Sequence, residues 1–484
     1  MRIEQFALDG LGHQSYLVVD ERTGMAAVVD PRRDVDVYLE AAQRHGARIT
    51  HILETHLHND YVTGARELAA RTAASSQNGE EVIVVASAEA PPAYAHQAVR
   101  DGDRLALGAV TVAVLATPGH TPEHVSYATY EPGSDTPHAL FSGGSMLVGG
   151  AGRTDLLGAA QTETLAHQQY HTLRRLLEML PATVLVYPTH GAGSFCVAGD
   201  VSASRHTTIG QERLASPAVH ARDAEEFTRQ QLAGYGEYPS YYAHMRPINQ
   251  AGPRVLGTLP EPPALAPAAI QTRMGTGVPL VDSRGREAFA QAHVPGALHI
   301  ELDPSFGTYA GWLLPFNAPL LLVVEDIAGQ REAVLQLIRI GYEQVEGTLH
   351  GGITAWRAAG LPTGAFARIT IPELHARWEG SDPPAILDVR RDDEWREGHI
   401  PGAQHIHVAD LPRRVAEVPE GRTVAVVCAS GYRASTGASI LAAAGRDAIA
   451  VQGGVPGWLR RGYPSVTPKD EPDSLSHQAE HAHP

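Results

Sequence analysis

Two copies of one pattern occupy the C-terminal part of the chain, and this internal repeat constrains the fold more than any other feature. Each copy has an Asp-x-Arg segment, then a His-x-Pro-Gly-Ala segment, and a closing Gly-Gly-x-x-x-Trp segment. These landmarks stand at 282–284, 293–297 and 351–356 in the first copy, and at 388–390, 399–403 and 453–458 in the second. Strand-like and helical patterns alternate in both copies. Each copy is therefore predicted to be a small α/β domain with a parallel sheet.

The composition limits the class of protein and its partners. A chain of 484 residues suggests about three domains. The net charge of -16 argues against a nucleic-acid partner, and no apolar run reaches the ~18 residues of a membrane span. Glu4 lies where a signal peptide would be apolar, and two cysteines in so long a chain suit a reducing compartment. We expect a cytoplasmic protein, and assembly as a homo-oligomer is compatible with the sequence.

Histidines follow three separate strand-like runs in the N-terminal half. The segment THLHNDY at 55–61 follows an apolar run at 49–54, and TPGHTPEH at 117–124 and YPTHG at 187–191 also follow strand ends. Turns that leave buried strands can bring side chains to one edge of a sheet, and imidazole is the commonest protein ligand for zinc and iron. A lone His-x-His could be a solvated loop, but three such segments together predict a metal centre.

These segments resemble the metallo-β-lactamase superfamily, which implies an αβ/βα sandwich for the N-terminal domain. TPGHTPEH at 117–124 and GRTD at 152–155 look like the persulfide dioxygenase branch of that superfamily. The resemblance implies one ferrous iron that, with O2, converts a low-molecular-weight thiol persulfide to sulfite and thiol. It also implies that Arg153 lies near the thiol substrate.

Two positions depart from the superfamily pattern. Tyr61 stands where the motif ends in His, and Gly144 stands where a strand normally delivers an acidic ligand. With these two changes, the sequence lacks two of the ligands that a binuclear zinc hydrolase needs, but only one of those that the dioxygenase iron needs. We expect a single Fe(II) per chain, with Zn(II) as the alternative. The candidate ligands that remain are His56, His58 and His120, with Asp60 and His190 nearby.

Three residues of the metal domain are candidate substrate contacts, namely Arg153, Tyr187 and Cys196. Tyr187 stands at the strand end that precedes His190. Cys196 has two interpretations. It is either a small buried residue or a thiol near the metal that takes up sulfane sulfur.

The segment CASGYR at 428–433 joins an apolar strand-like run at 423–427 to an alanine-rich helical segment at 434–445. The backbone N–H groups of such a loop and the positive end of the helix dipole favour the thiolate of Cys428. Arg433 adds a fixed charge for an anionic substrate or a bound persulfide. Protein tyrosine phosphatases have a similar loop with one more residue, so the smaller ring here suits sulfur. With its Asp-x-Arg and His-x-Pro-Gly-Ala segments, this copy looks like a single-domain rhodanese; an inert core cysteine is the alternative.

The middle copy lacks this cysteine. Its strand-like run at 320–324 is followed by Glu325 and Asp326, and a carboxylate cannot carry sulfane sulfur. It resembles the silent rhodanese-homology module of dioxygenase–rhodanese fusions, which implies a scaffolding role. The predicted organisation is a metal domain at 1–240, a Pro-rich linker at 241–268, an inactive rhodanese-homology domain at 269–363, an active rhodanese domain at 366–464 and a disordered tail at 465–484.

The main functional hypothesis is therefore a sulfur-oxidising fusion enzyme. A thiol persulfide is oxidised to sulfite at the metal, and Cys428 moves sulfur between persulfide, sulfite and thiosulfate. One alternative makes the metal domain a zinc-dependent thioester hydrolase of the hydroxyacylglutathione hydrolase type, fused to the same sulfurtransferase. A second alternative makes it a non-catalytic metal-binding scaffold that presents the rhodanese.

Overall fold

The computed structural model describes residues 1–75, 81–197 and 203–467, and the chain divides into two compact units. Unit 1 contains Met1–Pro260 together with Val334–Glu343. Unit 2 contains Glu261–Ala333 together with the chain from Gln344 onward. No helix among the described residues combines the length and the apolar character needed to cross a membrane.

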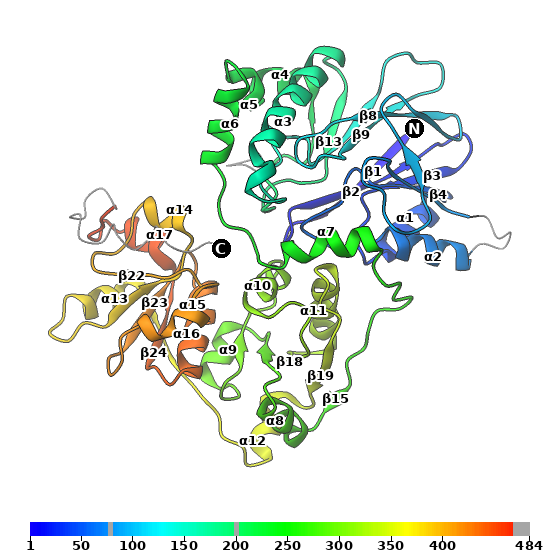
Figure 1. Ribbon diagram of the computed structural model, residues 1–484. Coiled ribbons are helices and arrows are strands. Elements are labelled where there is room, and N and C mark those ends of the chain that lie inside the picture. Colours follow the sequence, from blue (N-terminus) through cyan, green and yellow to red (C-terminus); the bar gives the residue numbers. More distant parts are fainter. Residues whose placement is uncertain (76–80, 198–202, 468–484) are drawn as a thin grey trace. The chain divides into compact units, whose positions relative to one another are not determined.

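Unit 1 is built on two six-stranded sheets (Figure 1). The first sheet holds its strands in chain order: β1 (Arg2–Leu8), β2 (His13–Val19), β3 (Met25–Val29), β4 (Arg48–Leu53), β5 (Ile83–Ser87) and β6 (Gln97–Val99). The second has the order β14-β13-β10-β9-β8-β7. Its strands are β7 (Arg104–Leu107), β8 (Val110–Ala116), β9 (Val125–Tyr130), β10 (Ala139–Gly143), β13 (Leu185–Pro188) and β14 (Thr207–Thr208). A small hairpin, β11 (Met146–Leu147) with β12 (Gly150–Ala151), follows β10.

The main core of unit 1 lies between these two sheets. Tyr16 and Leu53 from the first sheet meet Val114 and Phe141 from the second in one buried cluster. Helices α1 (Asp36–Arg44) and α2 (Ala65–Ser75) pack on the outer face of the first sheet. Helix α3 (Ala159–Met179) packs on the outer face of the second through its buried leucines. These four layers are the αβ/βα sandwich that the sequence resemblance implied, and that prediction is confirmed.

Four shorter helices complete unit 1: α4 (Ile209–Ala215), α5 (Pro217–His220), α6 (Ala224–Ala233) and α7 (Tyr242–Ala251). Helix α7 lies inside the stretch that we predicted to be a Pro-rich linker. It buries Tyr242, Met245 and Asn249 and carries Pro247 in its interior. The sequence prediction overlooked this helix because proline opposes a helix interior and more prolines follow directly after it.

Unit 2 contains two five-stranded sheets of the same topology, ordered β15-β19-β18-β16-β17 and β20-β24-β23-β21-β22, with every strand pair parallel. The first contains β15 (Ala264–Leu265), β16 (Leu280–Asp282), β17 (Leu298–His299), β18 (Leu320–Val323) and β19 (Val345–Leu349). The second contains β20 (Ala367–Thr370), β21 (Ala385–Asp388), β22 (Gln404–His405), β23 (Val424–Val427) and β24 (Ala448–Gln452). The two parallel α/β domains predicted from the repeat are confirmed.

Helices connect the strands of each repeat. The middle repeat has α8 (Pro267–Gly275), α9 (Arg286–Gln291), α10 (Phe306–Leu313), α11 (Ile327–Arg339) and α12 (Gly352–Ala358). The C-terminal repeat has α13 (Ile371–Trp378), α14 (Asp392–Arg396), α15 (Leu411–Arg414), α16 (Tyr432–Ala443) and α17 (Gly454–Leu459). The tail predicted as disordered, 465–484, lies outside the described residues from 468 on.

The Asp-x-Arg segments of the two repeats have the same structural role. Arg284 contacts Asp282 through Nε and Nη2 and donates to the carbonyl of Ala292 at 2.9 Å. Arg390 does the same with Asp388 and the carbonyl of Gly398, also at 2.9 Å. Because both repeats keep this buried ion pair, with or without a cysteine in the later loop, the motif supports the fold and does not mark a catalytic site.

Candidate functional site

The histidine segments of unit 1 lie at one edge of the two sheets, each just beyond a strand. His56 follows β4, His120 lies between β8 and β9, and His190 follows β13. The three side chains are buried. Each offers one ring nitrogen within 4.8 Å of the other two. The Nε2 atoms of His56 and His190 are 3.3 Å apart.

The outer nitrogen of each ring faces a group that fixes its tautomer. Nδ1 of His120 lies 2.7 Å from the carbonyl oxygen of Arg153, and Nδ1 of His190 lies 3.1 Å from Asp60 Oδ2. Nδ1 of His56 lies 2.8 Å from the Thr55 hydroxyl, which donates its own hydrogen to Asp30. The Arg153 carbonyl can only accept, and the Thr55 hydroxyl already donates to Asp30, so both oxygens accept a hydrogen from Nδ1 and leave the lone pair on Nε2 of His120 and His56.

Burial keeps the rings of His56 and His120 in the neutral form that binds metals. Desolvation, followed by the neighbouring His190, lowers the pKa of His120 to about 3. Desolvation and the neighbouring His58 and His120 likewise lower the pKa of His56 well below its usual value. Neutral imidazole is the ligand form of histidine.

The donor set fits one small cation. Three buried imidazoles face one another, and within the described part of the chain Nε2 of His120 has no hydrogen-bond partner. His58, Asp60 and His190 form a second group that meets the same distance limit, but it shares His190 with the first. Among the described residues, the best candidate ligands for a metal ion are therefore His56, His120 and His190.

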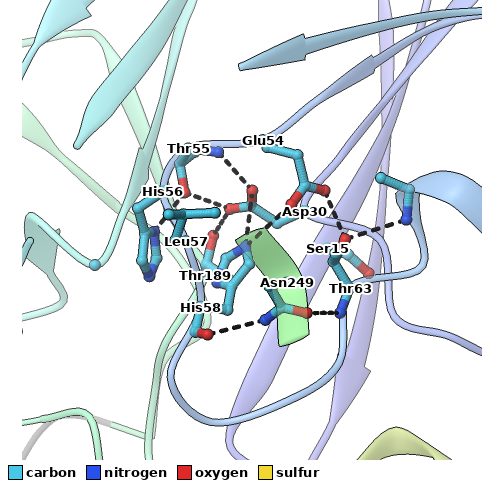
Figure 2. A network of polar contacts seen from close by, with 12 residues as sticks. Ser15, Asp30, Glu54, Thr55, His56, Leu57, His58, Thr63, Thr189 and Asn249 are labelled. Carbon is cyan, nitrogen blue, oxygen red and sulfur yellow. Dashed lines mark hydrogen bonds and ion pairs between the residues drawn. The ribbon is translucent and has the colours of Figure 1, made fainter. Parts of the chain in front are cut away.

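This arrangement differs from the set of His56, His58 and His120 that the sequence suggested. His58 lies among buried carboxylates, with its Nε2 3.3 Å from Asp30 Oδ1 and 3.9 Å from Glu54 Oε2. Figure 2 shows His58 beside Asp30 and Glu54. Burial would lower the pKa of His58, but the Asp30 and Glu54 carboxylates raise it above its usual value. Two buried acids therefore compete with a metal for this ring.

Asp30 is the centre of the polar network beneath the ligands, and the sequence prediction did not name it. Its carboxylate accepts hydrogen bonds from the backbone N–H and the hydroxyl of Thr55, at 2.8 and 2.7 Å, and from the hydroxyl of Thr189 (Figure 2). Thr55 precedes His56 and Thr189 precedes His190 in the chain. One carboxylate thus ties together two of the three ligand loops.

Helix α7 holds the ligand loop from the other side. Asn249 donates from Nδ2 to the carbonyls of His58 and Tyr61, at 2.9 and 2.8 Å, and accepts from the Thr63 N–H at 2.9 Å. Arg246, on the same helix, pairs through two nitrogens with the buried Glu123, at 2.9 and 3.0 Å. No sequence motif indicates these residues. The available hint was an Asn close to a proline, and its burial in a helix is known from the structure alone.

The two positions that depart from the superfamily pattern are both filled by packing. A Cβ on Gly144 would lie 2.2 Å from His120 Cδ2, so the ring of His120 occupies the place of a side chain there. The Gly144 N–H donates to His124 Nε2 at 3.0 Å. Tyr61 is fully buried and its hydroxyl donates to the carbonyl of Asp30 at 3.2 Å. Neither position can act as a ligand in this arrangement.

Arg153 lies beside the metal ligands mainly through its backbone. Its guanidinium pairs with Asp155 at 2.6 and 2.7 Å and stacks over the rings of Tyr235 and Tyr238, 5.0 and 4.6 Å from their centroids. Its N–H donates to the carbonyl of Cys196 at 2.8 Å.

Cys196 and Tyr187 are placed in packed surroundings. Cys196 is fully buried, and burial raises the pKa of its thiol well above the usual value. The ring of Tyr187 packs against Tyr16, Phe141 and His206. These contacts favour the interpretation of Cys196 as a small buried residue and place Tyr187 against the core between the sheets.

The second candidate site lies in unit 2, where Cys428 joins β23 to α16. Its side chain is as fully buried as that of Cys196, so the loop around it, and not exposure, distinguishes the two cysteines. The N–H of Gly431 donates to Cys428 Sγ at 3.0 Å, and Gly431 has a left-handed backbone with φ 105°. The loop is braced from behind by Gly454, where a Cβ would lie 2.1 Å from the carbonyl oxygen of Ala429. The closing Gly-Gly segment of the repeat thus permits the close backbone approach that shapes this loop.

Arg433 has a partner that the sequence prediction did not identify. Its two Nη atoms bind the two carboxylate oxygens of Glu394 on α14, with Nη2–Oε1 at 2.8 Å. The Arg433 side chain is 11% exposed. Most of its charge is therefore neutralised within the domain, and its first role is to hold the loop.

The middle repeat has a cavity but no sulfur nucleophile at the corresponding place. Glu325, between β18 and α11, lines a cavity of about 580 Å³ together with Ser283 and Arg284. Cys196 and Cys428 are the two cysteines of the chain, so neither lies in this repeat.

Comparison with known families assigns the two parts of the chain. Residues 8–190 match the metallo-beta-lactamase superfamily, and residues 266–359 and 370–461 each match the rhodanese-like domain. The chain contains one metallo-β-lactamase domain followed by two rhodanese-like domains. The metallo-β-lactamase domain carries the histidine cluster, and the second rhodanese-like domain carries Cys428, so the resemblance stated from the sequence is confirmed.

Enzymes of two kinds are similar to the metallo-β-lactamase domain. Hydroxyacylglutathione hydrolase from Rhodospirillum rubrum is 37% identical over 175 residues, which cover 36% of this chain and 60% of that protein. Mitochondrial persulfide dioxygenase ETHE1 from Bos taurus is 28% identical over 224 residues, covering 44% of this chain and 74% of that protein. A solved metallo-β-lactamase from Staphylococcus aureus subsp. aureus COL is 28% identical with a TM-score of 0.64, covering 72% of this chain and 98% of that one. The chain thus spans about 60% of the length of the hydrolase it matches.

Proposed function

We propose that the protein oxidises a low-molecular-weight thiol persulfide to sulfite in its metallo-β-lactamase domain and transfers sulfane sulfur at Cys428. In the first reaction a persulfide, O2 and water give a thiol and sulfurous acid, which ionises to sulfite. The observation that carries this proposal is the set of three buried imidazoles, His56, His120 and His190, each with one ring nitrogen within 4.8 Å of the other two. Such a set suits a single ferrous ion, and Fe(II) is the metal we propose.

In this proposal the bound iron supplies the activation of O2. The chain itself supplies rigid ligands: Asp60 orients His190, and the Arg153 carbonyl orients His120. Ligands fixed in this way keep their lone pairs aimed without reorganisation. The surrounding burial excludes bulk water from a site where a persulfide would otherwise be hydrolysed or exchanged.

At the second site the thiolate of Cys428 attacks the sulfane sulfur of a donor such as thiosulfate. The new S–S bond forms on Cys428, the S–S bond of thiosulfate breaks, and sulfite leaves with the electron pair. A thiophilic acceptor then takes the outer sulfur from the Cys428 persulfide and regenerates the thiolate. With sulfite as acceptor the reverse reaction forms thiosulfate, which would link the two sites through a shared product.

The competing function is hydrolysis of a glutathione thioester. The 37% identity with a hydroxyacylglutathione hydrolase supports it, as does the second group of His58, Asp60 and His190. Against it, the two groups share His190, and Tyr61 and Gly144 cannot serve as ligands here. A two-metal hydrolase therefore lacks enough separate donors.

Oxygen uptake distinguishes these functions. Protein purified without oxygen and loaded with either Fe(II) or Zn(II) should be given glutathione persulfide, and separately a glutathione thioester. We expect about one metal per chain, and O2 consumption with sulfite formation only in the iron-loaded protein. Thioester hydrolysis by the zinc-loaded protein without O2 uptake would establish the hydrolase. If the metal-loaded protein catalyses neither reaction, the domain is a non-catalytic scaffold.

A further inference from the structure

A cavity of about 450 Å³ lies beside the Cys428 loop and is lined by both rhodanese-like domains. The catalytic repeat contributes Ser430 and Gly431 of the loop and Arg368 of β20. The silent middle repeat contributes Arg286 and Glu301. The cavity is therefore shared between the two repeats and reaches the loop at Ser430 and Gly431, whereas the buried Cys428 is not one of its lining residues.

Arg286 is the middle-repeat residue that approaches the loop. Its Nη1 lies 3.5 Å from the position of a Cβ on Gly431, the residue whose N–H binds Cys428 Sγ at 3.0 Å. The guanidinium carbon of Arg286 lies 5.8 Å from the ring centroid of Tyr432. The positive charge of Arg286, from the silent repeat, thus lies next to Gly431 and Tyr432 of the loop.

Several contacts fix the middle repeat against this loop. The Tyr432 hydroxyl donates to the carbonyl of Glu301 at 2.9 Å, and the rings of Tyr309 and Tyr432 lie 5.0 Å apart. The backbone N–H of His299 also donates to the Ser439 hydroxyl on α16, at 3.0 Å. Arg286 is therefore held in register with the catalytic loop.

An anionic donor needs positive charge that Arg433 does not supply. Thiosulfate is a dianion and the chain has a net charge of -16, so the donor is repelled at long range. Arg433 is bound through both Nη atoms by Glu394. Arg286 is also paired, through Nη2 with Glu301 of the same cavity, but only one of its Nη atoms makes this contact and its Nη1 lies beside the loop. Arg368 has its acidic neighbour, Glu287, at 4.0 Å.

We propose that Arg286 of the silent repeat, with Arg368, binds the oxyanion end of the sulfur donor at the Cys428 site. This inference rests on the proposed sulfur transfer. The donor's sulfonate oxygens would contact the guanidinium groups while its sulfane sulfur faces Cys428. Sulfite, the leaving group, carries the same oxygens and would be held there until it departs. The silent repeat is on this view a substrate-binding part of the transferase, with Arg286 as a positioning residue.

The first test compares three variants of the full chain in the thiosulfate:cyanide assay. Arg286→Gln should raise the KM for thiosulfate roughly ten- to a hundredfold, the range for losing one charged hydrogen bond, and leave kcat within about twofold. Arg286→Lys should restore much of the affinity because it keeps the charge. Arg273→Gln, which removes an arginine of the same repeat outside the cavity, is the control and should match the wild type.

The second test measures the anion site without turnover. Cys428 should be alkylated with iodoacetate, which is anionic, and with iodoacetamide, which is neutral and of similar size. Arg286→Gln should lower the iodoacetate rate roughly tenfold and leave the iodoacetamide rate unchanged, since only the anion uses the guanidinium. Glu325→Gln should change neither rate.

These results separate the two proposals. An unchanged KM and an unchanged alkylation ratio in Arg286→Gln would overturn the anion site, as would a fall in kcat with no change in KM. Absence of thiosulfate turnover in the wild type would overturn the sulfur-transfer function, while the iodoacetate selectivity would still report on the anion site.

Discussion

The imidazole of His120 occupies the space where a side chain on Gly144 would begin, with Cδ2 2.2 Å from the Cβ position. A Cβ on Gly152 would also lie close to this ring, 2.7 Å from Nδ1. His120 therefore packs against two glycines. A side chain at position 144 and the present position of His120 exclude each other, which is consistent with the proposed centre made of histidines alone.

This relationship predicts that an acidic ligand cannot be restored by one substitution. Gly144→Asp should displace His120 and lower the metal content, because the new Cβ and the ring cannot share the space. Metal analysis and the melting temperature of the purified variant provide the measurement. Gly144→Ala is the matched control and should show the same displacement without the charge. A Gly144→Asp protein with full metal occupancy and a higher persulfide oxidation rate would contradict this account.

The identity of the third ligand can be tested by removing each histidine in turn. His56→Ala, His120→Ala and His190→Ala should each lose most of the bound metal, because two imidazoles bind too weakly. His58→Ala should keep the metal, since its ring faces Asp30 and Glu54, although the protein should be less stable. Metal per chain, measured by elemental analysis, decides the point. Metal lost from His58→Ala but kept in His190→Ala would restore the ligand set suggested by the sequence.

The two proposed activities should separate cleanly at Cys428. Cys428→Ser should abolish sulfur transfer, because a hydroxyl oxygen cannot carry sulfane sulfur, while metal content and persulfide-dependent O2 uptake persist. Mass spectrometry of the wild type after thiosulfate treatment should find an adduct of ~32 Da on Cys428, as the covalent mechanism requires. Cys196→Ser is the matched control and should retain transfer; an adduct found only on Cys196 would refute the assignment.

The Arg433–Glu394 pair should make the catalytic repeat sensitive to acid. Burial would raise the pKa of Glu394, but the hydrogen bonds and charge of Arg433 hold it below its usual value. The pair therefore stabilises the fold above the unfolded-state pKa of about 4.3, and this contribution is lost as the pH falls through the lower folded-state pKa. Glu394→Gln should lower the free energy of unfolding by about 3 kcal/mol near pH 7. This difference between variant and wild type should become smaller toward pH 3. Melting temperatures across this range test it, and a gap independent of pH would argue against the pair.

The sequence was sufficient wherever a periodic pattern or a local motif carried the information. The repeat predicted two parallel α/β domains, and the apolar run before Cys428 predicted the strand that delivers it. Histidines after strand ends predicted a common edge, because the αβ/βα sandwich brings those ends together.

What the sequence could not supply were choices that depend on distant partners. His56 and His58 look equivalent in THLHNDY, and only the carboxylates of Asp30 and Glu54 distinguish them. Asp30 has a left-handed backbone with φ 49°, which no motif indicates for a residue before proline. Arg433 likewise looked free for substrate until Glu394, from another helix, was placed against it.

The contacts of Asn249 also have a consequence for the order in which the protein matures. The ligand loop begins near residue 55, but three of its backbone groups are held by a side chain that lies 186 to 191 residues further along. During synthesis the chain emerges from its N-terminus, so all three histidines leave the ribosome before the residue that completes their support. The nascent metallo-β-lactamase domain can therefore meet metal ions while its binding loop is still adjustable. We expect tight retention of a metal ion only after α7 has docked, so that a helix without any of the proposed ligands would complete the centre.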